Sequence, residues 1–133
     1  MPAPSLSCID HFVLTVASID AACAFYRDAL GMEVERFAAA DGTTRTALRF
    51  GAQKINLHQA GAEFDPKALR PTPGSGDFCL VSDAPTGAWQ AHFHALGVAI
   101  EDGPVKRTGA RGPLVSLYVR DPDGNLVEIA RPA

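Results

Sequence analysis

The side chains best suited to chemistry are a histidine and a glutamate in apolar segments near the two ends of the chain. His11 lies within Ile9–Val16, and Glu128 stands between Leu126 and Ala130. In a strand, residues two apart share a face, and a carboxylate on a core-facing row needs a partner or a metal ion unless its strand turns outward at an edge. Imidazole and carboxylate groups both bind divalent metals. A single histidine in an apolar strand is usually an ordinary core or surface residue, so His11 alone does not identify a site.

Lys106, Arg107 and Arg111 form a basic cluster in the glycine-containing segment 103–112, which we expect to be a loop. Loops on a rigid sheet often carry binding residues, and guanidinium groups form paired hydrogen bonds with anions. The cluster is therefore either an ordinary solvated loop or a substrate-binding clamp for a carboxylate, a phosphonate or a thiol conjugate.

An internal repeat indicates how the chain positions these residues. Residues 29–35 (ALGMEVE) recur as residues 95–101 (ALGVAIE), 66 positions later (95 minus 29). A fixed offset of this kind indicates two similar structural units. The same offset leads from His11 to Asp77, a second candidate metal ligand, although an aspartate that follows Gly74-Ser75-Gly76 is also a common turn residue.

Each half predicts a strand, a helix and three further strands. The first half has strands at 9–16, 32–37, 46–50 and 54–59, with a helix that Ser18 caps and Gly31 ends. The second half has strands at 78–82, 98–101, 114–120 and 126–130, with a helix from Pro85 or Thr86 to Leu96. The predicted fold class is α+β: two βαβββ modules, residues 8–60 and 77–131, form a curved eight-stranded mixed sheet. A proline- and glycine-rich linker, residues 61–76, joins the modules.

Composition excludes several classes of protein. The chain has 133 residues, 47% of them hydrophobic, and a net charge of −3, which predicts one domain without the clustered positive charge that nucleic acid requires. No apolar run reaches the length of a membrane span, and the N-terminus has no signal-peptide pattern. The three cysteines include no CxxC pair, so we expect no disulfide framework and a cytoplasmic location.

Three segments together resemble the vicinal oxygen chelate superfamily, which includes glyoxalase I, bleomycin-resistance proteins, fosfomycin-resistance enzymes and extradiol dioxygenases. They are residues 9–16 (IDHFVLTV), 25–32 (FYRDALGM) and 121–128 (DPDGNLVE). Residues 54–59 and 104–110 are most similar to the virulence-associated, glyoxalase-domain-containing subgroup. The resemblance covers nearly the whole chain and implies a single domain over residues 1–133.

The resemblance implies a divalent metal ion (Mn, Fe, Ni, Zn or Mg) held by His11 and Glu128, with Asp77 the third ligand that the repeat indicates. Glu128 is also the candidate catalytic base, because a carboxylate on the metal is the only matched group with suitable basicity. Many members have histidine where this chain has Asp77, and aspartate makes the site richer in oxygen. The fourth ligand is either Asn56 or His58, which share one face of their predicted strand. His58 would give a site with two imidazoles, and Asn56 a site with one.

These features predict a metal-dependent, glyoxalase-like isomerase or lyase that acts on a small oxygenated or thiol-conjugated molecule. Glyoxalase I has a glutamate where this chain has Asn56 or His58, which counts against full glyoxalase I activity. The alternatives are a ligand-sequestering protein of the bleomycin-resistance type and an extradiol-type dioxygenase. The resemblance also implies a homodimer, with the two modules of a chain paired either with each other or with those of a second copy.

Overall fold

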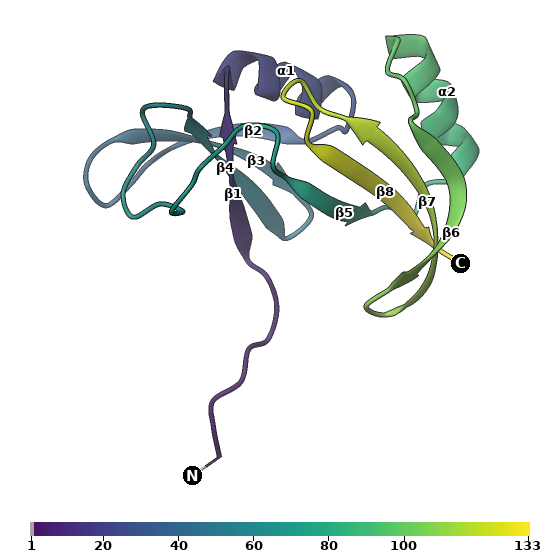
Figure 1. Ribbon diagram of the computed structural model, residues 1–133, viewed down its shortest axis with the longest axis horizontal. Coiled ribbons are helices and arrows are strands. Elements are labelled where there is room, and N and C mark those ends of the chain that lie inside the picture. The colour runs from purple at the N-terminus through teal and green to yellow at the C-terminus, as the bar shows by residue number, and fades with distance from the viewer. Residues whose placement is uncertain (1) are drawn as a thin grey trace.

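The computed structural model describes residues 2–133 and contains two βαβββ modules in sequence (Figure 1). The first comprises β1 (His11–Val16), α1 (Ile19–Asp28), β2 (Glu33–Ala38), β3 (Thr44–Phe50) and β4 (Gln53–Gln59). The second comprises β5 (Asp77–Val81), α2 (Thr86–Leu96), β6 (Asp102–Gly109), β7 (Gly112–Arg120) and β8 (Leu126–Pro132). The predicted α+β class is confirmed. Within residues 2–133, no helix is long and apolar enough to cross a membrane.

The eight strands form two separate four-stranded sheets, one in each module. Their strand orders are β1-β4-β3-β2 and β5-β8-β7-β6. The β1–β4 and β5–β8 pairs are parallel, and the other pairs are antiparallel. β1 and β5 are therefore edge strands. They approach each other through Phe12 and Phe78, whose ring centroids lie 4.9 Å apart.

Capping and burial explain the first helix. The Ser18 hydroxyl accepts a hydrogen bond from the Ala21 N–H and caps α1 as predicted. The chain leaves the helix through Gly31, whose φ of 69° suits a glycine. Ala22, Cys23 and Tyr26 face the sheet and are buried. They join a core that continues into the second module, where Phe93, Leu117 and Val127 belong to the same cluster.

A buried polar contact joins the two modules. The Tyr26 hydroxyl on α1 donates a hydrogen bond of 2.7 Å to the Asp121 carboxylate, which lies in the turn between β7 and β8. The side chain and the backbone N–H of Asn125 also donate to Asp121. Asn125 in turn accepts a hydrogen bond from the Gly76 N–H at the end of the linker. We call Tyr26, Asp121 and Asn125 the inter-module contact. Its hydrogen bonds from Tyr26 and Asn125 stabilise the Asp121 carboxylate, because a charged group that is buried away from water needs hydrogen-bond donors.

The second module differs from prediction in the position of one strand. The sequence predicts a strand at 98–101 and a loop at 103–112, whereas β6 spans Asp102–Gly109 and pairs with β7. The error arose because Val98 and Ile100 are apolar, yet they pack against the core from a connecting segment. Pro104 is tolerated because β6 is an edge strand, which needs backbone partners on one side only.

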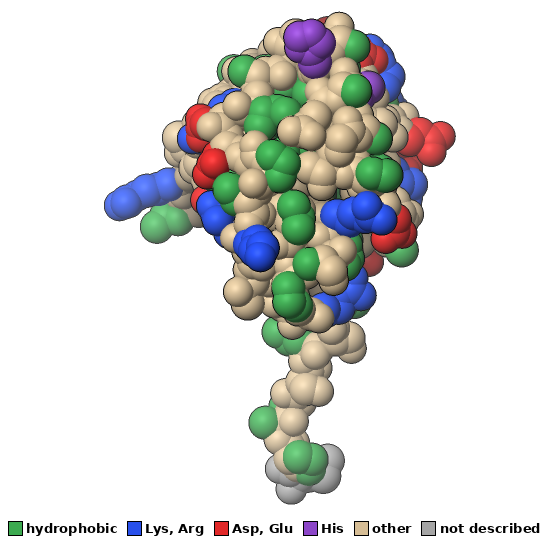
Figure 2. All heavy atoms as spheres, turned by 90° about the vertical axis from the view of Figure 1, so that its right-hand side faces the viewer, with side chains coloured by type: hydrophobic (Ala, Val, Ile, Leu, Met, Phe, Trp, Pro, Cys, Tyr) green, Lys and Arg blue, Asp and Glu red, His purple; other side chains and the backbone are tan. Residues whose placement is uncertain are grey.

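The outer end of the second module carries exposed apolar side chains. Figure 2 shows them as a band between lysine and arginine side chains. Of α2, Phe93 is buried, whereas Leu96 is exposed. Residues 2–10 lead away from the body as an extended segment (Figure 1).

Candidate functional site

The register of β1 against β4 determines which side chains share a face in the first module. His11 pairs with Lys54, Val13 with Asn56 and Thr15 with His58. The alternate residues, including Leu14, Ile55 and Leu57, are buried in the core against α1. Because paired residues in a sheet point to the same side, His11, Asn56 and His58 all lie on the face opposite α1.

The second module repeats this register. Asp77 pairs with Leu126, Cys79 with Glu128 and Val81 with Ala130. The offset of 66 relates Val13 to Cys79, so the partner of Val13, which is Asn56, is the structural counterpart of Glu128. By the same argument, the counterpart of His58 is Ala130. The alternation of residues in the sequence does not decide between Asn56 and His58, whereas the strand register favours Asn56 as the fourth candidate ligand.

His11 is oriented by its neighbour. Its Nδ1 lies 2.8 Å from a carboxylate oxygen of Asp10. A carboxylate only accepts hydrogen bonds, so Nδ1 carries the proton and Nε2 is left as the ligand atom. The hydrogen bond from His11 also holds the pKa of Asp10 below its ordinary value. Both side chains lie near the surface, since that of His11 is 43% exposed and that of Asp10 is 86% exposed.

Asn56 contributes an amide oxygen with no partner. Its Oδ1 is buried and has no hydrogen-bond donor among residues 2–133. A buried acceptor without a donor is costly, and either a cation or a donating ligand would relieve that cost. His58, two residues further along β4, is only 7% exposed and packs edge-on against Phe64. Burial and the nearby Arg45 lower the pKa of His58, which favours the neutral imidazole.

Glu128 is held among polar groups of its own module. The Ser116 hydroxyl on β7 donates a hydrogen bond of 2.6 Å to its Oε2 atom. On the other side lies Cys79, its cross-strand partner. Burial and the adjacent Glu128 carboxylate raise the pKa of the Cys79 thiol to about 11, so the thiol keeps its proton at neutral pH. Sequence analysis missed Ser116. The signal was a small polar residue between Leu114 and Tyr118 on one face of an otherwise apolar strand.

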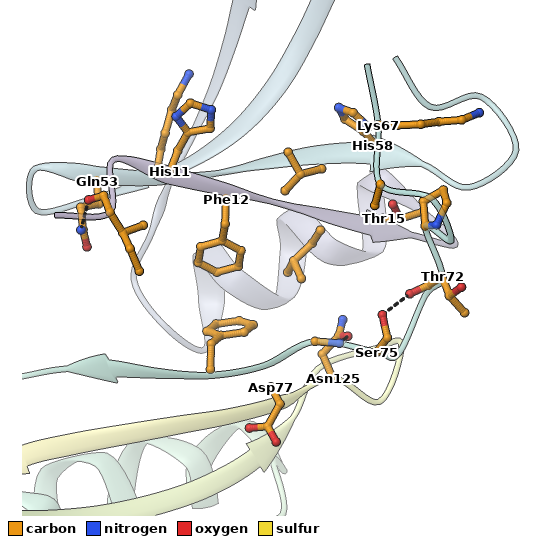
Figure 3. Close-up of a pocket in the computed structure, with 18 of the residues that line it drawn as sticks. His11, Phe12, Thr15, Gln53, His58, Lys67, Thr72, Ser75, Asp77 and Asn125 are labelled. Carbon is orange, nitrogen blue, oxygen red and sulfur yellow. Dashed lines mark hydrogen bonds between the residues drawn. The ribbon is translucent and has the colours of Figure 1, made fainter. Parts of the chain in front are cut away.

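One chain presents these candidates as two half-sites: His11 and Asn56 on the first sheet, and Asp77 and Glu128 on the second. Figure 3 shows His11 and Asp77 pointing to opposite sides of the region where Phe12 meets β5. Within residues 2–133, no three His, Cys, Asp or Glu side chains are grouped closely enough to hold a metal ion. The predicted ligands therefore do not converge inside a single chain, because the sheets meet through the core-side residues of β1 and β5.

Two cavities lie near the half-sites. The larger, about 760 Å³, is bounded by β1, β5 and linker residues 66–72, and Phe12, His58 and Lys67 are among its lining residues (Figure 3). The smaller, about 290 Å³, lies beside Glu128 beneath the β6–β7 hairpin. Arg111 at the hairpin tip and Leu114 line this second cavity. The linker thus packs over the larger cavity.

The three basic residues predicted to bind substrate lie in different environments. Lys106 and Arg107 belong to β6 and not to a loop. Arg107 donates a hydrogen bond to the Tyr118 hydroxyl and lies 3.6 Å from the Asp102 carboxylate, so its charge is partly neutralised within the protein. Arg111 lines the cavity that also contains Glu128.

Comparisons with known proteins agree with this architecture. The family model described as "Glyoxalase/Bleomycin resistance protein/Dioxygenase superfamily" matches residues 8–129. Virulence protein STM3117 of Salmonella typhimurium is 50% identical over 123 residues, which cover 92% of this chain and 83% of that protein. Its crystal structure has a TM-score of 0.92, at 47% identity, and the match covers 98% of this chain and 100% of that one.

Two further relatives extend the comparison. Glyoxalase domain-containing protein RDO1 of Mycosarcoma maydis is 50% identical over 126 residues, which cover 95% of this chain and 69% of that protein. A lactoylglutathione lyase from Agrobacterium tumefaciens is 29% identical with a TM-score of 0.70, and the match covers 96% of this chain and 95% of that one. The extent of the family match, together with two relatives at half identity, establishes that this chain belongs to the glyoxalase/bleomycin resistance protein/dioxygenase superfamily, the vicinal oxygen chelate superfamily.

Proposed function

We propose that the protein is a metal-dependent, glyoxalase-like enzyme whose site forms between two copies of the chain. His11 and Asn56 of one copy would face Asp77 and Glu128 of the other. The observation that carries the proposal is the matched register of the two half-sites: each places two oxygen or nitrogen donors on adjacent parallel strands, on the face turned away from the helix. The unpartnered Oδ1 of Asn56 is the atom that most clearly lacks a ligand.

The exposed edge strands support a second copy as the partner. β1 and β5 each have a backbone edge outside the pairs of their own sheet. Both carry exposed apolar side chains on the donor-bearing face, since Val13 is 44% exposed and Val81 is 54% exposed. Unpaired edges with apolar side chains favour association with another strand. Pairing of β1 with β5 of a second copy would bring complementary half-sites together, and C2 symmetry would create two such sites.

The donor set fits a hard divalent cation. One imidazole, one amide oxygen and two carboxylates are ligands typical of manganese, magnesium or ferrous iron, and less so of zinc. When bound, such an ion would polarise two adjacent oxygens of a substrate and stabilise the negative charge that develops on them. Asp10 holds Nδ1 of His11 and so leaves Nε2 as the ligand atom, and Asn56 would contribute an oxygen without adding charge.

Glu128 is the candidate catalytic residue. A carboxylate in this position can take a proton from one substrate carbon and return it to the neighbouring carbon. Arg111 and Glu128 both line the smaller cavity, so the Arg111 guanidinium would bind an anionic group of the substrate there. On the adjoining strand, Arg107 pairs with Leu114 and so shares the face of Glu128, whereas Lys106 pairs with Val115 and points to the opposite face. The substrate class supported best is therefore a small oxygenated or thiol-conjugated molecule that carries an anionic group.

Metal analysis tests the proposed function. Purified protein reconstituted with Mn²⁺ is expected to bind about one ion per chain and to run as a dimer in size-exclusion chromatography with light scattering. His11→Ala and Glu128→Ala are each expected to lose the ion and to remain folded, because both side chains lie outside the apolar core. Wild-type protein that binds no divalent ion, or that stays monomeric when metal-loaded, would contradict the proposal.

The larger cavity supports one alternative, ligand sequestration in the manner of bleomycin-resistance proteins. Its volume of about 760 Å³ and its aromatic lining suit a small molecule. A sequestering protein needs no metal ligands, so the double variant His11→Ala with Glu128→Ala separates the two functions. Ligand binding that survives both changes would favour sequestration.

A further inference from the structure

Ser116 is a fully buried hydroxyl group that contacts the candidate catalytic carboxylate. It lies on β7 with no exposed surface, and its Oγ atom is 2.6 Å from Oε2 of Glu128. A short hydrogen bond to a charged acceptor is stronger than one between neutral groups. The side chain of Glu128 is therefore tied to the neighbouring strand by one of its two oxygens.

The strand register explains why the contact is specific. Tyr118 is the direct cross-strand partner of Glu128, and Ser116 lies two residues before it on the same face of β7. The hydrogen bond consequently runs diagonally and draws the carboxylate toward the hairpin cavity, which Glu128 lines. Cys79 flanks Glu128 on β5, and its thiol is close enough to hydrogen-bond with the carboxylate. Because the Ser116 hydroxyl holds Oε2, a further ligand would meet Glu128 through Oε1.

We propose that Ser116 is a positioning residue that fixes Glu128 to bind a metal ion through one oxygen. This inference rests on the proposed function, because it requires that Glu128 be a ligand. A glutamate side chain that is free to rotate loses conformational entropy when it binds an ion. Ser116 removes that freedom in advance, as hydrogen-bonding partners of metal ligands commonly do. Because the hydroxyl holds Oε2, Glu128 would hold the ion through its other oxygen.

The test is a titration of the wild-type protein and its variants with Mn²⁺, in which calorimetry measures the affinity for the ion. Ser116→Ala is expected to weaken Mn²⁺ binding by about 10- to 100-fold, the range typical of a lost partner of a metal ligand. Ser116→Thr keeps the hydroxyl and is expected to stay within about threefold of wild type. Urea unfolding of each variant shows whether it is folded under the conditions of the titration.

Ser18→Ala is the matched control. It removes the same hydroxyl group from the chain, and it lowers stability because Ser18 caps α1, but it lies in the other module and contacts no candidate ligand. Its Mn²⁺ affinity is expected to equal that of wild type. If loss of stability alone weakened binding, Ser18→Ala would weaken it as well.

The outcomes separate this inference from the proposed function. Weaker binding in Ser116→Ala, with normal binding in Ser18→Ala, supports the positioning role. Equal binding in Ser116→Ala and wild type, or an equal loss in Ser18→Ala, overturns the positioning role and leaves the metal site intact. Wild-type protein that binds no Mn²⁺ overturns both.

Discussion

Mixed dimers made from two defective chains test whether the half-sites combine between copies. Suppose that one chain carries His11→Ala and the other Glu128→Ala. In a site shared between copies, one site of the mixed dimer contains both substitutions, and the other contains neither. Chains with different N-terminal tags allow the mixed dimer to be purified by two affinity steps, because residues 2–10 lead away from the body of the molecule.

The expected metal content follows from this geometry. Each single-variant homodimer has a defect in both sites and is expected to bind no Mn²⁺. The purified mixed dimer has one intact site of two, so it is expected to bind about half of the wild-type amount. Elemental analysis or a Mn²⁺ titration measures the stoichiometry directly, without knowledge of the substrate.

The reciprocal dimer is the control. A wild-type chain paired with a chain that carries both substitutions has one defect in each shared site, so it is expected to bind no Mn²⁺. If each site were built within one chain, the results would be reversed: the first mixed dimer would bind none, and the reciprocal dimer would bind about half. That reversed result would refute the argument from strand register and from the divergent directions of His11 and Asp77.

Three further predictions concern the fold. Tyr26→Phe removes one donor from the buried Asp121 carboxylate and is expected to lower the free energy of unfolding by about 1.5–3 kcal/mol, measured by urea denaturation; an unchanged midpoint would contradict the role of the inter-module contact. His92→Ala removes the ring nitrogen that lies 3.1 and 3.0 Å from the Asp28 and Ala29 carbonyls at the end of α1, and we expect a loss of about 1 kcal/mol in the same assay, with His94→Ala as the control. Hydrogen bonds from Thr43, together with Arg45, lower the pKa of Asp41 from 3.8 to about 2, so Asp41 stabilises the fold above pH 3.8 and loses this effect as the pH falls toward 2. Thermal unfolding of Asp41→Asn between these values is expected to show a shallower loss of stability than wild type, and identical curves would refute this assignment.

Much of the fold was predictable because local patterns and tertiary packing agree. The repeat that relates residues 29–35 to residues 95–101 predicted two modules, and Ser18 and Gly31 marked the limits of α1. The strand at β6 was misplaced because its Pro104 and glycines are typical of a loop. Only its pairing with β7 reveals that an edge strand accepts them.

The candidate site was less predictable, because its geometry depends on pairings between distant segments. Alternation places Asn56 and His58 on one face, but only the pairing of Val13 with Asn56 and of Cys79 with Glu128 indicates which one corresponds to Glu128. Ser116 is related to Glu128 by a diagonal contact across two strands, and residue types do not encode such contacts. The separation of the half-sites depends on how the two sheets meet at Phe12 and Phe78.

The inter-module contact belongs to the scaffold of the molecule and contains none of the candidate ligands. Two of the segments that make the chain recognisable, residues 25–32 and 121–128, meet in the hydrogen bond between Tyr26 and Asp121. They hold the halves of the molecule in a fixed orientation, whatever molecule the protein binds. These segments therefore specify a scaffold that enzymes and ligand-sequestering proteins of this superfamily have in common. The difference between these two functions is expected at positions 11, 56, 77 and 128, where the candidate ligands lie.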